Sequence, residues 1–325
     1  MHMADALVSP PVAIAAGAVA ATLIVIASRQ VSRIRRDDIV PLMGVMGAFV
    51  FAAQMINFSI PGTGSSGHII GGILLAALMG PWAAFLVLCS VLIIQCLVFA
   101  DGGLMALGCN IVNMAAMSCL VAYPLVYRPL AGRRRKGWHL MAAAVVACVV
   151  GLELGALLVT AETELSGITA LPTREFLLFM LPIHLAIGLC EGVATGLLLC
   201  FVGAYKPDMF YSPSMPDGTP EQKYRMSPKT KRVLWIFGIV AVSLAVSFTW
   251  LASSSPDGLE WSVAKVAGAA GLDGSYVPPT AVLPDYDSTL SGVIGGAIVV
   301  VLVWGLSTFI FRKRRVAAGV TRKKL

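Results

Sequence analysis

Charged side chains are scarce in this chain of 325 residues, since Asp, Glu, Lys and Arg make up 13% of it, whereas soluble globular domains average about 25%. Hydrophobic residues account for 58%, and the mean hydropathy is +0.84. These values exclude an ordinary soluble domain and indicate an integral membrane protein. Enzyme signatures are missing as well, because the sequence has no HExxH motif, no GxSxG nucleophile elbow and no Walker A motif. We therefore expect no catalytic residue and no organic cofactor. If the chain moves a solute uphill, another chain has to supply the energy.

Long apolar runs predict an all-α membrane protein. A helix needs about 20 apolar residues to cross the roughly 30 Å of hydrocarbon. One shorter run, 69–79, is about half a bilayer long and is followed by Gly80-Pro81, so it is either a short tilted helix or a re-entrant one. The longer spans are expected near 8–28, 39–57, 81–100, 106–127, 138–161, 176–204, 233–252 and 290–311.

Lysine and arginine predict the orientation, because positive residues stay on the cytoplasmic side of a membrane. Of the 24 basic residues, 22 fall in the segments 29–36, 128–136, 206–232 and 312–325. The N-terminus is then outside and the C-terminus cytoplasmic. All four basic segments lie on one side only if 69–79 also crosses, which gives about nine spans. The net charge of +7 thus marks the cytoplasmic face, and we expect no nucleic-acid partner. The other loops are acidic and hold Glu162, Glu164, Asp257, Glu260, Asp273, Asp285 and Asp287.

Two membrane parts are expected on either side of a linker. Residues 1–205 hold a bundle of about seven helices, 206–232 is a polar, proline-rich cytoplasmic linker, and 233–325 forms two spans around an outside loop. No basic segment precedes the first apolar run, so we expect no cleaved signal peptide. Initiator methionine is trimmed before small residues, and because His2 is large we expect Met1 to stay in the mature chain.

Histidine is a better guide to chemistry here than cysteine. All seven cysteines fall in predicted spans without a CxxC pair, which favours a role as small apolar residues. His139 and His184 also fall in spans, and for both a hydrogen-bonded structural role is favoured over metal ligation. His2 and His68 differ, since the predicted topology places both on the outer side.

A histidine at position two can chelate a metal ion together with the chain terminus. The α-amine of Met1, the backbone amide of His2 and the His2 imidazole supply three nitrogens through fused rings, and His68 can supply the fourth. A square-planar set of four nitrogens favours Ni(II) or Cu(II), with Co(II) possible. Binding displaces protons, so affinity falls in acid. The alternative is that a histidine follows the initiator by accident.

The loop before His68 has the sequence Pro61-Gly-Thr-Gly-Ser-Ser-Gly-His68. Gly62 and Gly67 have the spacing of a phosphate-binding loop, but the Lys-Ser/Thr that must follow is absent and the loop is predicted outside. We therefore expect no nucleotide site. The glycines permit a tight backbone that carries His68 toward the N-terminus, and an ordinary flexible loop is the alternative.

Polar groups inside spans mark a possible metal path. Glu153 and Glu191 are costly to bury. For Glu191, which lies among GxxxG units that permit close helix packing, a structural hydrogen bond and a role in the path are equally compatible with the sequence. Further candidates for the path or the surroundings of the ligands are Asp5, Asp101, Asn110, Asn113 and His184. On the first span, Ala13, Gly17 and Ala21 repeat every four residues and suggest a face for a neighbouring helix or a partner subunit.

Several motifs together resemble one family. The start Met1-His-Met-Ala-Asp-Ala-Leu-Val-Ser-Pro10 resembles the MHIPDG-x-LSP start of the CbiM/NikM-type substrate-binding component of nickel and cobalt energy-coupling factor transporters. The block at 60–68, Phe99-Ala-Asp-Gly-Gly103 with Asn110, and 183–192 are similar to later motifs of that family. Ser255-Pro-Asp-Gly-Leu-Glu260 resembles the PDGLE signature of the small CbiN/NikN component, so the chain looks like a fusion of the two. It departs from the pattern at Ala4 and Ala6, where the family often has Pro and Gly.

The resemblance implies a function and partners. The metal ligands would be the Met1 amine, the amide and imidazole of His2, and His68. The chain would be the non-enzymatic component, in the bacterial cytoplasmic membrane, of an importer for Ni(II) or Co(II). Its partners would be a transmembrane coupling protein, cytoplasmic ATPase subunits and membrane lipid. The PDGLE loop would lie outside near the metal site and help loading.

Three alternatives remain open at this point. The first is the same scaffold specialised for cobalt and supplying cobalamin synthesis. The second is a proton-coupled or channel-type divalent metal carrier that uses Glu153 and Glu191 and needs no ATPase. The third is a membrane structural or assembly protein, which predicts no bound metal on the purified chain.

Overall fold

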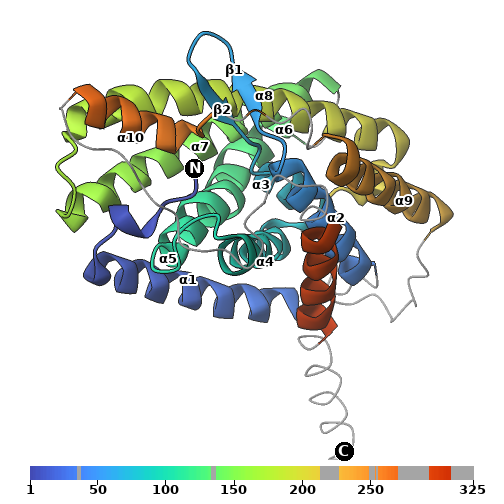
Figure 1. Cartoon of the computed structure of the whole chain (residues 1–325). Helices are drawn as coiled ribbons and strands as arrows, with labels where there is room; N and C mark the ends of the chain where they lie inside the picture. The colour runs from blue at the N-terminus through green and yellow to red at the C-terminus, as the bar shows by residue number, and fades with distance from the viewer. Residues whose placement is uncertain are drawn as a thin grey trace, which may run out of the picture.

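The computed structural model describes residues 1–34, 38–132, 137–212, 227–248, 253, 255–269 and 293–308. The fold is mostly helical (Figure 1), and a helix is found at each of the eight longer predicted spans. The long helices are α1 (Pro10–Val31), α4 (Pro81–Phe99), α7 (Gly137–Ser166), α8 (Thr173–Tyr205) and one continuous helix over Leu107–Ala131, which consists of α5 (Leu107–Asn110), the π-helical η2 (Ile111–Tyr127) and α6 (Arg128–Ala131).

These five helices are long and apolar enough to cross a membrane, so the chain is a multi-pass membrane protein. The other apolar helices are shorter: α2 (Ile39–Gln54), α9 (Pro228–Ser243, continued by η4, Leu244–Phe248) and a helix over Val293–Thr308. The count of about nine spans and the orientation of the termini stay predictions. The predicted orientation depends in part on basic residues that lie outside the described residues, at 35–36, 133–136 and 312–325. Positions 213–226 of the linker also lie outside them.

The half-length run 69–79 forms the short helix α3 (Gly72–Met79), whose eight residues are all buried. At 1.5 Å per residue this helix is about 12 Å long. Gly71 before it and Gly80 after it have φ of 78° and 86°, a left-handed backbone that favours glycine. Because Pro81 then starts α4 at once, α3 is a deeply buried half-helix joined to a full span.

Close helix contacts occur where the GxxxG units predicted them. A Cβ added to Gly188 would lie 2.9 Å from the Cα of Val149, and one added to Gly192 would clash with the backbone of Val145. The small face of α8 therefore packs directly on α7. The two C-terminal helices both pack on α2: the rings of Phe49 and Phe237 meet edge to face with centroids 5.0 Å apart, and Gly47 lies against Val299.

A small antiparallel hairpin carries the glycine-rich loop. Its strands are β1 (Phe58–Ile60) and β2 (Ser65–Gly67), and His68 follows β2 directly. Within the segment expected to be a loop around the PDGLE motif, the structure instead contains a helix, α10 (Gly258–Ala269). In Figure 1, α10 (orange) lies along α8, with which it is in contact, and the buried N-terminus lies close to α10 and β2. Positions 254 and 270–289 of this predicted loop lie outside the described residues.

Candidate metal-binding site

The first three residues enter the core rather than extend into solvent. Met1, His2 and Met3 are 4%, 9% and 0% exposed. The side-chain amide of Asn110 pairs with the backbone of Met3. The Met3 N–H donates to Asn110 Oδ1 (2.7 Å), and Asn110 Nδ2 donates to the Met3 carbonyl (3.1 Å). The Gly103 N–H donates to the same carbonyl (2.9 Å). Hydrogen bonds to the backbone of Met3 therefore fix the position of the chain terminus.

The terminus meets His68 across 67 positions of sequence. The Met1 nitrogen lies 3.3 Å from His68 Nε2. The rings of His2 and His68 are stacked, with centroids 5.2 Å apart and planes 24° from parallel. His68 is 8% exposed. The structure thus brings together the α-amine and the two imidazoles that the sequence singled out.

Glu191 positions the segment that carries His68. Its two carboxylate oxygens accept the N–H groups of Ile70 and Gly71, both at 2.9 Å. These are orphan donors in the turn that enters α3, and a buried carboxylate satisfies both at once. Of the two interpretations left open by the sequence, the structural hydrogen bond is the one seen here.

The amine is also bound by Asp257 of the PDGLE segment, which sequence reasoning placed only near the site. Asp257 Oδ2 accepts a 2.5 Å ion pair from the Met1 ammonium. The same residue caps α10, since Asp257 Oδ1 accepts the Glu260 N–H (2.8 Å) and Glu260 Oε2 accepts the Asp257 N–H (3.2 Å). This is a capping box, so the Asp-x-x-Glu spacing was a signal in the sequence for both the missed helix and the fixed carboxylate.

The hairpin holds the PDGLE segment in place. The Ser66 N–H donates to the carbonyl of Pro256 (2.8 Å), and the Ser66 hydroxyl donates to the carbonyl of Ser255 (2.7 Å). The indole of Trp261 donates to the carbonyl of Thr63 (2.9 Å). The glycine-rich loop and the PDGLE segment therefore form one continuous cover over the terminus.

An oxygen atom lies within hydrogen-bond distance of each nitrogen of the His2 ring, and the neutral ring donates to one of the two. Nδ1 lies 3.1 Å from Asp101 Oδ1, and Nε2 lies 3.2 Å from Gln95 Oε1. Gln95 donates to Gln54 (2.7 Å), which in turn donates to the carbonyl of Ile70 (2.8 Å). A chelate that uses Nδ1 therefore requires the ring to leave Asp101.

Burial and charge set the protonation of these groups. Burial, aided by the nearby ammonium, lowers the pKa of both His2 and His68 to about 3, so both rings are neutral at pH 7. Burial raises the pKa of Asp101 to about 6. Burial would also raise the pKa of Asp257, but the ion-paired Met1 ammonium outweighs it and holds that pKa well below its usual range. Two neutral imidazoles and one paired amine thus face each other.

The remaining sequence candidates fall into two groups. Asp5 Oδ1 accepts the Ala106 N–H (3.0 Å) and lies at the start of η1 (Asp5–Leu7), so it supports the terminal segment. His184 lines a small cavity of about 10 Å³ together with Met1, His68 and Asp257. Asn113, in contrast, donates to Glu162 (2.7 Å) of α7.

Among the described residues, no group of three or more His, Cys, Asp or Glu side chains is arranged to hold a metal ion. The set that converges here has only two imidazoles and relies on the chain terminus for its other nitrogens. A square-planar ligand set of this composition suits Ni(II), Cu(II) or Co(II).

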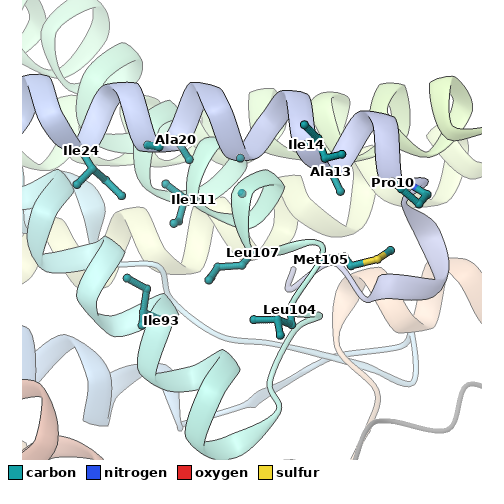
Figure 2. Close-up of a pocket in the computed structure, with 13 residues that line it drawn as sticks. Pro10, Ala13, Ile14, Ala20, Ile24, Ile93, Leu104, Met105, Leu107 and Ile111 are labelled. Atoms are coloured by element: carbon teal, nitrogen blue, oxygen red, sulfur yellow. The ribbon is translucent and has the colours of Figure 1, made fainter.

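The predicted partner face lies on an open apolar groove of about 580 Å³ (Figure 2). Ala13 and Ala20 of α1 border it, opposite Ile93 of α4 and Leu107 of α5. Gly17 has two roles. A Cβ at Gly108 would lie 2.5 Å from the Gly17 nitrogen, so the two backbones are in contact there. A Cβ at Gly17 itself would meet no described residue outside its own helix within 4 Å. The groove is therefore open where Gly17 and the exposed Ala21 line it.

Comparisons with known proteins all find metal uptake or transport proteins. Residues 2–209 match the CbiM family, described as the cobalt uptake substrate-specific transmembrane region, and residues 231–312 match the PDGLE domain. A fused NikMN chain of Archaeoglobus fulgidus is 32% identical, with 86% of this chain and 90% of that one covered. The fused nickel transport protein NikMN of Rhodobacter capsulatus is 29% identical, with 92% and 95% covered. The crystal structure of a truncated transition metal transporter matches with a TM-score of 0.54 and 31% identity, covering 62% of this chain and 98% of that one.

Proposed function

Because the chain belongs to the CbiM family of metal-uptake membrane components and carries a PDGLE domain, we propose that it is the substrate-binding component of an ATP-driven energy-coupling factor importer. Its substrate is Ni(II) or Co(II), captured on the outer side. ATP hydrolysis belongs to separate subunits.

One observation carries the proposed metal site: the Met1 nitrogen lies 3.3 Å from His68 Nε2, with His2 stacked on the same ring. We assign the Met1 amine, the His2 amide and imidazole, and His68 Nε2 as the four ligands. Neutral imidazoles offer lone pairs at pH 7 without losing protons. The ion enters as the amine leaves Asp257 and the His2 ring turns from Asp101.

Asp257 gives the PDGLE segment a specific part in this proposal. It neutralises the ammonium in the metal-free state and holds the terminus beside His68. The segment therefore assists loading of the ion by keeping three ligand nitrogens close together before the metal arrives, which reduces the entropy cost of binding.

The proposed topology has about nine spans, with the N-terminus outside and the C-terminus cytoplasmic. The domains are 1–205, the linker 206–232 and 233–325. A contact within the described residues supports a deep course for α3. The Tyr211 N–H, from the predicted cytoplasmic linker, donates to the carbonyl of Ala77 at the far end of α3 from His68 (2.9 Å).

Nickel is the favoured substrate, because a strong in-plane nitrogen field suits it and a fused relative is named for nickel transport. The same scaffold specialised for cobalt is the alternative, supported by the description of the family. The proposed partners are a transmembrane coupling protein and ATPase subunits, with the groove beside Ala13, Gly17 and Ala21 as the contact.

The free amine makes the proposal testable on the purified full-length chain. An uncleaved peptide before Met1, His2→Ala or His68→Ala is expected to abolish bound Ni²⁺ and Co²⁺, measured by elemental analysis, while the protein still folds. His139→Ala is the control, since that ring stacks on Trp138 away from the cavity. A chain with a blocked terminus that binds metal and supports normal uptake would contradict the assigned site.

The carrier alternative predicts a different energy source. Glu191 is bonded at both oxygens to backbone N–H groups, which suits a structural role better than a moving proton. Uptake in cells is expected to stop when ATP is depleted and to survive collapse of the proton gradient. The reverse result would favour a proton-coupled carrier.

A further inference from the structure

Among the described residues, one buried side-chain nitrogen lacks a hydrogen-bond partner, and its residue shares a cavity with the proposed ligands. The residue is His184, which is fully buried in α8, and the nitrogen is its Nε2. An unpaired buried polar atom destabilises the fold, and such atoms in a native protein call for an explanation.

The other nitrogen of the ring fixes the state of Nε2. His184 Nδ1 lies 2.8 Å from the carbonyl oxygen of Met180. A carbonyl only accepts, so Nδ1 carries the proton and Nε2 presents a lone pair. Metal-ligating histidines show this arrangement, in which one ring N–H donates to a backbone carbonyl and the other nitrogen faces the ion.

The surroundings of His184 contain the proposed metal ligands. The cavity of about 10 Å³ that His184 lines is also lined by Met1, His68 and Asp257. That volume is roughly what a single water molecule or ion requires. Its other walls are mainly apolar and include Leu152 and Ile187. The PDGLE segment closes the cavity tightly, since a Cβ on Gly258 would lie 3.3 Å from His184 Cε1.

We propose that His184 Nε2 is a transfer ligand: it takes up the Ni²⁺ or Co²⁺ ion as the ion leaves the four-nitrogen site on its way inward. This inference rests on the proposed function and adds a second metal position to it. Ligands are exchanged one at a time in this step. A bond to His184 Nε2 forms as a bond to one of the four nitrogens breaks, and no electrons are transferred.

Glu191 is the next acidic group on the same helix, but it is already engaged in hydrogen bonds. Glu191 lies seven residues after His184 on the same helix face. Both of its oxygens accept hydrogen bonds from the N–H groups of Ile70 and Gly71, so binding an ion there would compete with the bonds that hold the turn before α3. His184 Nε2, in contrast, has no partner among the described residues and presents a lone pair to the ion.

The test compares His184→Ala and His184→Gln with the wild-type full-length chain. Both variants keep the four proposed nitrogens, so we expect equilibrium binding of Ni²⁺ and Co²⁺ to stay at the wild-type stoichiometry. Release of bound Ni²⁺ to an excess of chelator, and uptake of radioactive Ni²⁺ by cells that contain the partner subunits, are expected to slow by at least about tenfold.

Glutamine separates ligation from packing, because it fills most of the volume and forms hydrogen bonds but lacks an imidazole nitrogen. If His184→Gln releases and imports Ni²⁺ like the wild type, the transfer role is wrong and a bound water explains the cavity. His139→Ala is the matched histidine control and is expected to behave like the wild type. Thermal unfolding of each variant shows whether slow release follows from lost stability, which would also overturn the inference.

Failure of the proposed function gives a different pattern. If the wild-type chain binds no metal, or if blocking the Met1 amine has no effect, the four-nitrogen site is wrong whatever His184 does. If the wild-type chain binds metal through the Met1 amine and His184→Gln releases and imports Ni²⁺ like the wild type, only the transfer step is wrong.

Discussion

Asp257 and Met1 are 256 positions apart in the sequence, yet the carboxylate of one and the ammonium of the other form a 2.5 Å ion pair. The pair joins the C-terminal PDGLE module to the residue proposed to supply the first metal ligand. Both side chains are largely withdrawn from solvent, at 2% and 16% exposure. A fusion of the two modules keeps them at high effective concentration, which under the proposed function favours re-formation of this contact after each metal ion passes.

Asp257→Asn is expected to weaken this contact without changing its shape. A hydrogen bond to a charged group contributes about 1.5–3 kcal/mol, so the free energy of unfolding should fall by about that amount, as measured by thermal or denaturant unfolding in detergent. Loading of Ni²⁺ should slow, because the terminus is no longer held beside His68. Glu260→Gln is the control, since it alters the cap of α10 and leaves the ammonium paired. Equal stability and loading in Asp257→Asn and the wild type would show that the ion pair has no role.

Asn110 and Asn113 provide a matched comparison on one helix. Asn110 bonds both the N–H and the carbonyl of Met3, whereas Asn113 bonds Glu162. We expect Asn110→Ala to lower the affinity for Ni²⁺ by about 10- to 100-fold, the usual cost of losing a group that orients a ligand. Asn113→Ala should keep the wild-type affinity. Isothermal titration calorimetry of both variants measures this, and equal losses would mean that Asn110 does not act through the terminus.

Proton release on metal binding follows from the pKa values of the rings. His2 and His68 have pKa values of about 3, so above about pH 4 both are neutral and release nothing. The Met1 ammonium and the His2 amide each lose a proton, so about two protons should leave per ion. The logarithm of the affinity should rise with pH with a slope of about two.

Ordinary histidines would behave differently in acid. With pKa values near 6.5, the two rings would add up to about two protons to the slope below that pH. Calorimetry in buffers of different ionisation enthalpy, at pH values on either side of 6.5, measures the number of protons released. A slope that steepens below that pH would mean that the rings are protonated in the metal-free protein.

Much of the fold was predictable from apolar runs, because a span has to satisfy its backbone hydrogen bonds internally and is therefore a helix. The positions of α1, α4, α7 and α8 follow from this rule. The convergence of His2 and His68 followed from the chelating ability of the terminus together with a glycine-rich turn. Asp257 was not predicted as a contact of the amine, since no periodic pattern relates a residue of the C-terminal module to Met1. The unpaired Nε2 of His184 depends on side-chain packing and cannot be derived from sequence spacing.

The groove along α1 provides a test of partner assembly that leaves the metal site intact. Ala21 is exposed, a Cβ at Gly17 would meet no described residue outside its own helix within 4 Å, and both residues line the groove. Ala21→Leu adds bulk at an exposed position that lines the groove. If the coupling protein docks there, bulk at this point prevents close approach of its helix. We expect the subunits that co-purify with the wild-type chain to be lost, and uptake with them, while binding of Ni²⁺ is unchanged. Ala18→Leu adds the same bulk to an exposed position of α1 outside the groove and should leave assembly intact. Loss of partners from both variants would indicate a general effect on the helix, and loss from neither would place the docking surface elsewhere.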